Sequence, residues 1–130
     1  YDYYTTTKGI LEKVKTHAGD VDFEVQPKLL SLFSNRDFGR YAGEKGEMNV
    51  CFISNNDITG GNSGSAMFNA RGELLGLAFD GNWEAMSSDI LYEPKMQRCI
   101  GVDVRYILFM IEKYGKAGDL IRELKIVSGK

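Results

Sequence analysis

The sequence predicts a mainly β fold with a C-terminal helix, and three observations support this fold class. Short apolar runs alternate along the chain with clusters of Gly, Asn and Asp that favour turns. Two of these runs, 66–68 and 74–79, are joined by a short loop containing Asn and Gly, which is typical of a β-hairpin. The C-terminal end instead places its apolar residues at helical spacing.

The N-terminal part is expected to hold one strand and one short helix. Residues 1–14 open with Tyr and Thr and continue as a strand-like stretch, which Gly9 interrupts, up to a loop rich in Gly and Asp. Pro27 then begins a helix near 27–34, because proline is favoured at the first helical position and the following apolar residues have helical spacing. Residues 39–46 are expected to form a loop.

The middle of the chain is expected to supply the other strands. Residues 48–53 form a short apolar run typical of a buried strand. The hairpin follows, and a turn at 80–82 leads into an irregular excursion over 83–94. Residues 100–104 are the last predicted strand.

The C-terminal end is expected to be helical. Asp103 is suited to cap a helix over 105–114, and Gly115 is expected to end it. A second helical stretch follows at 120–126. We interpret one stripe of the first helix as the side that faces the core, and it consists of Ile107, Leu108 and Ile111.

Composition limits the class of protein. A length of 130 residues fits one domain or a piece of a larger one, and 43% hydrophobic residues suffice for a packed core. The formal net charge of -2, without a basic stripe, argues against nucleic acid as a partner. No apolar run approaches the ~20 residues that span a membrane. Because the chain starts at Tyr1 rather than at Met, we interpret it as a cut fragment.

Two cysteines, Cys51 and Cys99, lie far apart in the sequence and form no metal-binding pattern. They either pair or are both free buried thiols, and the sequence leaves these options open. No metal and no cofactor is expected.

Residues 60–65, Gly-Gly-Asn-Ser-Gly-Ser, allow two interpretations. Gly and Asn tolerate left-handed backbone angles, so such a string forms turns without any chemistry. A serine nucleophile, however, also needs a tight turn that exposes its hydroxyl and directs backbone N–H groups at a developing oxyanion. The N–H groups of Gly61 and Ser63 are spaced to converge on one oxygen, and the hairpin offers a strand for pairing with a substrate backbone.

Longer stretches of the sequence resemble a known family. Thr59 to Ser65, followed by Gly72 and Gly76 in a hairpin, resembles the second barrel of chymotrypsin-like serine peptidases. Ala66 departs from that pattern, which usually has proline at this position. Five stretches together resemble the C-terminal end of the bacterial dipeptidyl-peptidase 7 and 11 family, closer to dipeptidyl-peptidase 7: YDYYTTTKGILEKV, FSNRDFGRY, GGNSGS, GLAFDGNWEAMSSD and VDVRYILFMIEKY.

This resemblance covers essentially the whole chain and implies a domain organisation. The chain is expected to be a fragment containing the second, C-terminal barrel of a chymotrypsin-like double β-barrel. Residues 1–104 are then the C-terminal barrel half of the peptidase domain, with the short helix near 27–34. Residues 105–130 are a C-terminal helical segment.

The resemblance also implies roles for individual residues. Ser63 is expected to be the acylated nucleophile, and Gly61 to contribute an oxyanion-hole N–H. Members of the family release dipeptides from a free N-terminus, and an aspartate that corresponds to Asp80 binds the α-ammonium group. A carboxylate that faces an ammonium in a closed cleft makes a short, charge-assisted hydrogen bond. The residues alone allow Asp80 equally well to be the start of an Asp-Gly turn.

Gly81 is the position that lines the specificity pocket in this family. Arginine there accompanies acidic residues before the scissile bond, whereas glycine leaves the pocket open and uncharged. An unpaired carboxylate in an apolar slot is costly, so Gly81 implies a preference for apolar or aromatic residues. As a plain turn glycine it would imply nothing about substrate. Trp83 and Glu84 are expected to pack or cap a loop, and neither Asp57 nor Asp89 stands out as a catalytic acid.

A serine nucleophile needs a general base within hydrogen-bond reach. The one histidine, His17, lies 46 positions before Ser63 (63 − 17), in a loop, and we do not assign it this role. The resemblance places the base and the acid upstream, in a missing first barrel. A missing helical domain is expected to cap the cleft, so the isolated chain is expected to be inactive.

Two alternatives stay open: half of a chymotrypsin-like endopeptidase, for which Asp80 has no ammonium to bind, and a non-catalytic barrel module. The implied partners are peptide substrates and the missing N-terminal barrel and helical domain of the parent chain, whose full-length form is open to homodimer formation. Neither nucleic acid nor a membrane span is expected. Family members are exported, which implies the periplasm or cell surface.

Overall fold

The centre of the molecule is a five-stranded antiparallel sheet with the strand order β1-β2-β5-β4-β3. The computed structural model describes residues 2–87, 91 and 93–127. Within them the edge strands β1 and β3 do not pair with each other, so the sheet is open. The strands are β1 (Tyr4–Thr6), β2 (Asn49–Ser54), β3 (Ala66–Phe68), β4 (Leu74–Gly81) and β5 (Cys99–Asp103).

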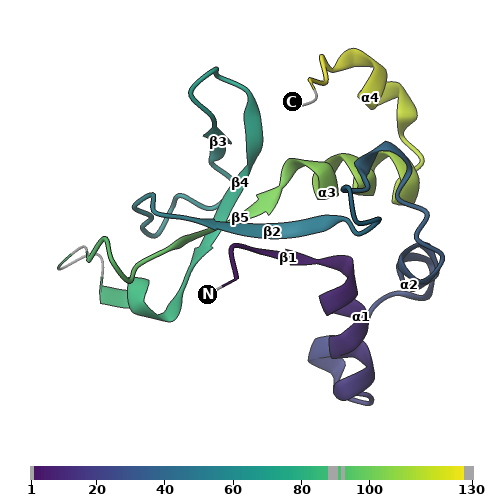
Figure 1. Ribbon diagram of the computed structural model, residues 1–130, viewed down its shortest axis with the longest axis horizontal. Coiled ribbons are helices and arrows are strands. Elements are labelled where there is room, and N and C mark those ends of the chain that lie inside the picture. Colours follow the sequence, from purple (N-terminus) through teal and green to yellow (C-terminus); the bar gives the residue numbers. More distant parts are fainter. Residues whose placement is uncertain (1, 88–90, 92, 128–130) are drawn as a thin grey trace.

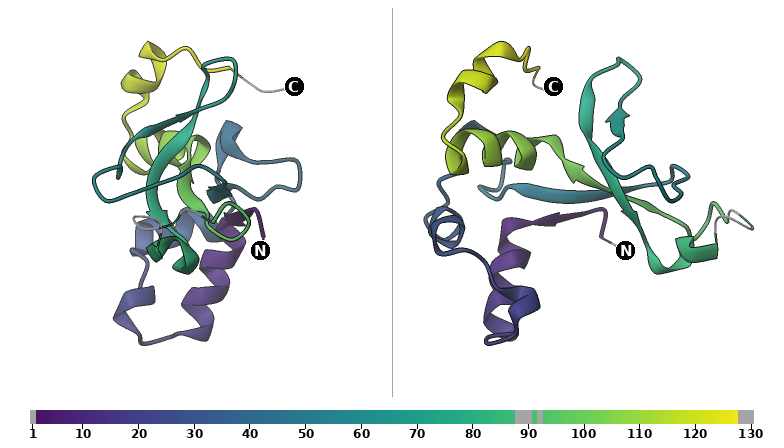
Figure 2. Two further views of the ribbon diagram at one scale, coloured as in Figure 1. Left: turned by 90° about the vertical axis from the view of Figure 1, so that its left-hand side faces the viewer. Right: turned by 180° about the vertical axis from the view of Figure 1, so that it is seen from behind.

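The helices gather at one end of this sheet, and the β3–β4 hairpin and the segment after β4 lie at the other end (Figures 1 and 2). No helix in the described part of the chain is both long enough and apolar enough to cross a membrane. The helices are α1 (Thr7–Thr16), α2 (Pro27–Ser34), α3 (Val104–Phe109) and α4 (Gly118–Glu123), the π-helix η4 (Met110–Tyr114), and the short 3₁₀ turns η1 (Val21–Phe23), η2 (Gly39–Tyr41) and η3 (Trp83–Ser87). The predicted fold class, a mainly antiparallel sheet with a C-terminal helix, is confirmed.

The predicted strands form, with one change in burial. The hairpin prediction is confirmed by the pairing of β3 with β4, and β5 corresponds to the last predicted strand. The strand predicted at 48–53 forms as β2, but its residues are only half-buried. The buried residue is Met48, which directly precedes the strand and is 0% exposed.

The strand-like stretch predicted for the N-terminus is wrong beyond Thr6. Strand β1 ends there, and the following residues form α1, with an N–H···O bond from Thr7 to Met48 joining the helix start to β2. The apolar residues Ile10, Leu11 and Val14 have the spacing of one helix face, and the first two pack against the hydrophobic core. Tertiary packing therefore outweighs the glycine within this segment.

The hydrophobic core lies between the helices rather than in the sheet. Its buried residues come from α2, the η2 region, the start of β2 and the C-terminal helices: Phe33, Phe38, Tyr41, Met48, Leu108, Phe109 and Ile121. Phe33 and Phe109 stack with ring centroids 6.0 Å apart, and Phe38 meets Phe109 edge-on at 6.1 Å. Pro27 begins α2, as predicted.

The C-terminal helix begins at a side-chain cap from Asp103 and ends at Gly115. Asp103 caps α3 as predicted, because its carboxylate accepts the Arg105 N–H at 2.8 Å. Of the predicted core-facing stripe, Leu108 is buried in the core and Ile111 packs against it. Gly115 follows η4 with φ −77°, and the residue with a left-handed backbone is Lys116, so Gly115 is no left-handed stop. A Cβ at Gly115 would lie 2.9 Å from the Ile111 carbonyl oxygen, which explains why glycine fits.

The two cysteines are free thiols on neighbouring strands. Cys51 is paired with Val102, and Cys99 with Ser54, so the cysteines are three positions apart along the ladder. That offset corresponds to about 10 Å, beyond the reach of a disulfide. Burial raises the pKa of both thiols.

Candidate active site

The loop that contains Ser63 is fastened to the sheet by two short backbone hydrogen bonds. Gly64 N–H donates to the Ala78 carbonyl at 2.7 Å, and Ala78 N–H donates to the Ser65 carbonyl at 2.9 Å. Ala78 lies in β4 and is buried. The two residues that follow Ser63 are therefore anchored to the sheet.

Two glycines give the loop its shape. Gly61 and Gly64 have φ values of 93° and 88°, in the left-handed region that glycine adopts without strain. Between them, Asn62 accepts the Thr59 N–H on its side-chain oxygen at 3.0 Å. The string is thus a well-defined turn, and the interpretation as a turn and the interpretation as a nucleophile loop are compatible.

The Ser63 hydroxyl is exposed and donates a long hydrogen bond, 3.4 Å, to the carbonyl oxygen of Phe79. The N–H groups of Gly61 and Ser63 donate to no acceptor among the described residues. They are consequently available to an external oxygen atom, which is what an oxyanion hole requires.

Strand β4 is irregular where it passes this loop. Ala78 is paired with Gly101 and Asp80 with Ile100, so Phe79 is an extra residue and makes a β-bulge. The Asp80 carboxylate is exposed and accepts the Gly81 N–H at 2.8 Å through Oδ1. Asp80 and Gly81 are the last two residues of β4 and pair with β5, so the turn predicted at 80–82 is wrong for these two positions. Oδ2 of Asp80 has no donor among the described residues.

A pocket of about 250 Å³ opens beside the serine and brings together Ser63, Asp80 and Gly81, three of the four predicted site residues. Gly61 does not line it. Sequence reasoning missed the remaining lining residues, which are Ile58, Thr59, Gly60, Phe79, Asn82, Ala85 and Met86. Proximity to Ser63 in the sequence could have suggested the first three. Ala85 and Met86 enter the pocket only because η3 turns the chain back, which no motif indicated.

Asn82 fixes the segment after β4. Its side-chain N–H groups donate to the Met96 carbonyl and to Glu84 Oε2, both at 2.8 Å, and its Oδ1 accepts the Arg98 N–H at 2.8 Å. The expectation that Glu84 helps to cap a loop is consistent with this contact. Trp83, which was expected to pack, is instead 81% exposed.

The histidine of the chain lies elsewhere. His17 ends α1, contacts the Thr16 hydroxyl at 2.9 Å through Nδ1 and stacks on Phe23, with ring centroids 4.1 Å apart. In all views α1 and the loop between β2 and β3 are on different sides of the molecule (Figures 1 and 2). Asp57 is exposed and does not line the pocket. Asp89 lies outside the described residues.

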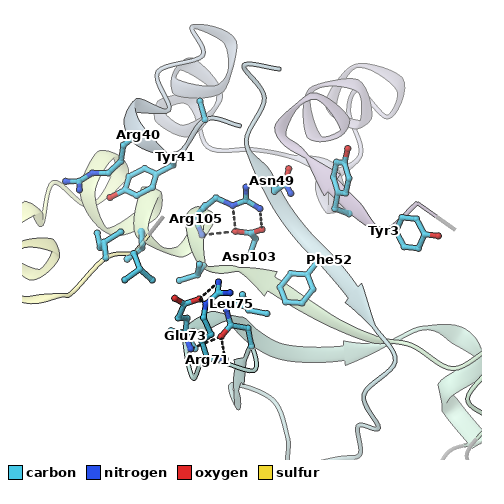
Figure 3. Close-up of a pocket in the computed structure, with 18 of the residues that line it drawn as sticks. Tyr3, Arg40, Tyr41, Asn49, Phe52, Arg71, Glu73, Leu75, Asp103 and Arg105 are labelled. Carbon is cyan, nitrogen blue, oxygen red and sulfur yellow. Dashed lines mark hydrogen bonds and ion pairs between the residues drawn. The ribbon is translucent and has the colours of Figure 1, made fainter. Parts of the chain in front are cut away.

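A larger groove of about 1030 Å³ lies on the other side of the hairpin, between β1, β2, β4 and α3 (Figure 3). Asp103 and Arg105 form a two-pronged ion pair in its middle, with contacts of 2.9 and 2.6 Å. Apolar and aromatic side chains surround this pair, among them Tyr3, Phe52 and Leu75. The groove contains none of the predicted site residues.

Comparison with known sequences agrees with the resemblance noted above. Residues 1–126 match the family described as Peptidase S46. The chain is 57% identical over 129 residues to dipeptidyl-peptidase 7 of Porphyromonas endodontalis, an alignment that covers 99% of this chain and 15% of the relative. It is 47% identical over 127 residues to the Asp/Glu-specific dipeptidyl-peptidase of Capnocytophaga gingivalis, which covers 98% and 18%.

Solved structures give the same answer. The crystal structure of Porphyromonas endodontalis DPP11 in complex with the dipeptide Arg-Glu matches with a TM-score of 0.88 and 44% identity, over 95% of this chain and 17% of that one. The same enzyme in complex with substrate matches with a TM-score of 0.89, again at 44% identity, and over 95% and 18%.

The chain thus spans less than a fifth of the length of these relatives, in agreement with its interpretation as a fragment. Its fold and its sequence both match members of one family, and its serine loop is consistent with that match. The chain belongs to the peptidase S46 family.

Proposed function

We propose that this chain is the C-terminal part of a serine exopeptidase that releases dipeptides from the free N-terminus of peptides. The observation that carries the proposal is the pocket in which Ser63, Asp80 and Gly81 meet, in a chain of the peptidase S46 family. The relatives named dipeptidyl-peptidase agree with this reaction class.

Ser63 is the proposed nucleophile. Its Oγ attacks the carbonyl carbon of the second substrate residue, and the N–H groups of Gly61 and Ser63 stabilise the oxyanion that forms. The amine of the remaining peptide leaves, and water then hydrolyses the acyl-enzyme. The base that takes the Ser63 proton is proposed to come from the upstream part of the parent chain, because the histidine of this chain lies away from the loop.

Asp80 is the proposed anchor for the substrate α-ammonium group. Its exposed carboxylate lies in the same pocket as Ser63, and Oδ2 has no donor among the described residues. An ammonium group would supply a charge-assisted hydrogen bond, whereas an acetylated N-terminus would leave the carboxylate unpaired. If Asp80 binds the α-ammonium group while Ser63 attacks the carbonyl of the second residue, the released product is a dipeptide.

The proposed preference is for an apolar or aromatic residue before the scissile bond. No lysine or arginine lines the described pocket, and Asp80 would repel an acidic side chain. The nearby Arg98 guanidinium is occupied elsewhere, donating to carbonyls of Pro94, Lys95 and Gln97. The relatives named Asp/Glu-specific make an acidic preference the alternative, and the experiment below separates the two.

We further propose that the parent protein is exported to the periplasm or cell surface and that its full-length form associates as a homodimer. The missing N-terminal barrel and helical domain would complete the cleft. Localisation is testable by fractionating cells that produce the parent protein, and association by its mass in solution.

The test uses the full parent chain and dipeptide substrates with Leu, Phe, Asp or Glu before the scissile bond, each with a free or an acetylated N-terminus. Cleavage of the free Leu and Phe substrates is expected, with loss of at least about 10³-fold in Ser63→Ala. Ser65→Ala is the matched control, because Ser65 contributes only backbone bonds to the loop. Equal cleavage of free and acetylated substrates would contradict the exopeptidase proposal, and a preference for Asp or Glu would contradict the proposed specificity alone.

A further inference from the structure

Two small residues in contact with each other line the Ser63 pocket. Gly81 and Ala85 both line it, and a Cβ built on Gly81 would lie 2.8 Å from the Cβ of Ala85. Real Cβ atoms essentially never approach other atoms so closely, so one of these two positions must yield if the other grows. The next atom in line, Ile58 Cγ2, is 3.6 Å away and makes an ordinary contact.

Ala85 has little freedom to yield. Its N–H donates to the Asn82 carbonyl at 2.9 Å, which closes the first turn of η3. Asn82 is itself held at both backbone and side chain by the segment that leads into β5, through Met96 and Arg98. The methyl group of Ala85 is therefore fixed against the pocket by a hydrogen-bonded turn.

We infer that Ala85 is a specificity-determining residue and that Ala85 and Gly81 act as a pair whose combined size sets how large a substrate side chain the pocket accepts. The inference rests on the proposed function and assigns a role to the part of the pocket wall beside Gly81. Two small residues leave room for a large side chain before the scissile bond. A larger residue at position 85 takes that room, and a larger residue at position 81 fits only when position 85 loses its methyl group.

The first experiment measures kcat/KM of the full parent chain for two substrates that differ only in having Phe or Ala before the scissile bond. Ala85→Leu is expected to lower the Phe/Ala ratio by roughly tenfold or more, since a side-chain pocket discriminates on this scale. Ala70→Leu is the matched control, the same change at an exposed hairpin position outside the pocket. A loss shared equally by both substrates would indicate a structural role and overturn the inference.

The second experiment tests the pair with Gly81→Ala, Ala85→Gly and the double variant. Gly81→Ala is expected to lower kcat/KM for the Phe substrate by roughly tenfold, because its new methyl group collides with that of Ala85. The double variant should return to within about threefold of Ala85→Gly alone, the rescue expected of coupled neighbours. If kcat/KM of the double variant for the Phe substrate is no higher than that of Gly81→Ala, the proposed pairing of the two positions is overturned.

The thermal midpoints of the same variants separate this inference from the proposed function. If the parent chain shows no Ser63-dependent release of dipeptides, the proposed function fails. The steric pairing still predicts that Gly81→Ala lowers the midpoint and that the added Ala85→Gly restores it. If dipeptides are released but Ala85→Leu leaves the Phe/Ala ratio of kcat/KM unchanged, the proposed function stands and the inference fails.

Discussion

Tyr41 shows how one residue links the core to its rim. The ring is 3% exposed, and its hydroxyl donates to Glu112 Oε2, a carboxylate that also pairs with Arg40 at 3.9 Å. Burial, together with the bond to Glu112, raises the pKa of Tyr41 to about 12. The folded chain therefore favours the neutral phenol, which stabilises the fold fully below the ordinary tyrosine pKa near ~10.

This stabilisation should disappear at alkaline pH. As the pH rises from ~10 through about 12, the unfolded chain releases the Tyr41 proton more readily than the folded chain, so the free energy of unfolding falls. Urea denaturation of this chain at a series of pH values should show the fall, and Tyr41→Phe should show less of it. Burial also raises the pKa of Tyr106, but Tyr106 is present in both proteins. The difference between the two curves therefore reports the contribution of Tyr41 alone. Parallel curves between pH 10 and 12 would contradict the assignment.

Asp103 carries two interactions that can be separated. Its carboxylate caps α3 through the Arg105 N–H and also binds the Arg105 guanidinium. Asp103→Ala removes both and should lower the free energy of unfolding by about 2 kcal/mol, whereas Asp103→Asn keeps a capping oxygen and should cost about 1 kcal/mol. Denaturant titrations of the three proteins provide the measurement, and equal losses would show that the cap contributes nothing.

At the scale of elements, α1 is a helix that contains an avoidable weakness. Gly9 lies inside it, and a Cβ built there meets nothing within 4 Å. Its φ is not in the left-handed region, so no turn geometry requires glycine. The cost of glycine in this helix is conformational entropy rather than packing.

Gly9→Ala is therefore expected to raise the free energy of unfolding by about 0.5–1 kcal/mol. Gly76→Ala is the opposite control, because a Cβ at Gly76 in β4 would lie 2.1 Å from the Val102 carbonyl oxygen. That variant should be destabilised or fail to fold. Thermal unfolding of this chain distinguishes them, and a lower midpoint for Gly9→Ala would argue against the helix.

The sequence predicted elements best where local chemistry and the fold agree. Pro27 and Asp103 mark helix starts by their own backbone and capping properties, and the hairpin follows from its Asn and Gly loop. The strand prediction for the N-terminal segment is wrong because it relied on the Tyr and Thr residues at the start, whereas Ile10, Leu11 and Val14 fit helical spacing. What decided between them was packing against a core built from distant residues.

The same limit applies to the site. A motif indicated Ser63, and the resemblance indicated Asp80 and Gly81, so the sequence predicted three of the residues that line the pocket. The pocket walls at Ala85 and Met86 depend on a turn held by Asn82, whose partners are more than ten positions away in sequence. Such contacts leave no periodic pattern, and only the folded chain shows them.

At the scale of the whole molecule, packing and proposed chemistry occupy opposite ends. The buried core lies among the helices, while exposed apolar side chains follow β3, β4 and the segment after β4: Phe68, Leu74, Leu75, Phe79, Trp83, Met86 and Leu91. Apolar surface gathered in this way usually marks an interaction site. For a chain that spans less than a fifth of its relatives, we propose that the remainder of the parent protein covers this surface.

This division predicts an activity that needs both parts. The isolated chain should release no dipeptides, because its one histidine, His17, lies away from Ser63 (Figures 1 and 2). Mixing it with the remainder of the parent protein, produced as a separate polypeptide, should restore measurable release from a free-N-terminus substrate. The same mixture made with Ser63→Ala controls for contaminating peptidases. Turnover by the isolated chain that depends on Ser63 would contradict the proposal that the base lies upstream.

The extra residue in β4, Phe79, determines which face of the sheet carries Asp80, the candidate ammonium anchor. Side chains along a strand alternate between its two faces, so residues two positions apart normally share a face. Ala78 is 7% exposed while Asp80 is exposed, because Phe79 is interposed without a partner and reverses the alternation. Changing the identity of Phe79 preserves this arrangement, whereas a register in which Phe79 itself paired with Ile100 would remove the bulge and place Asp80 on the face of Ala78. The pairing register on either side of Phe79, rather than the side chain of Phe79, therefore decides which face of the sheet carries the Asp80 carboxylate.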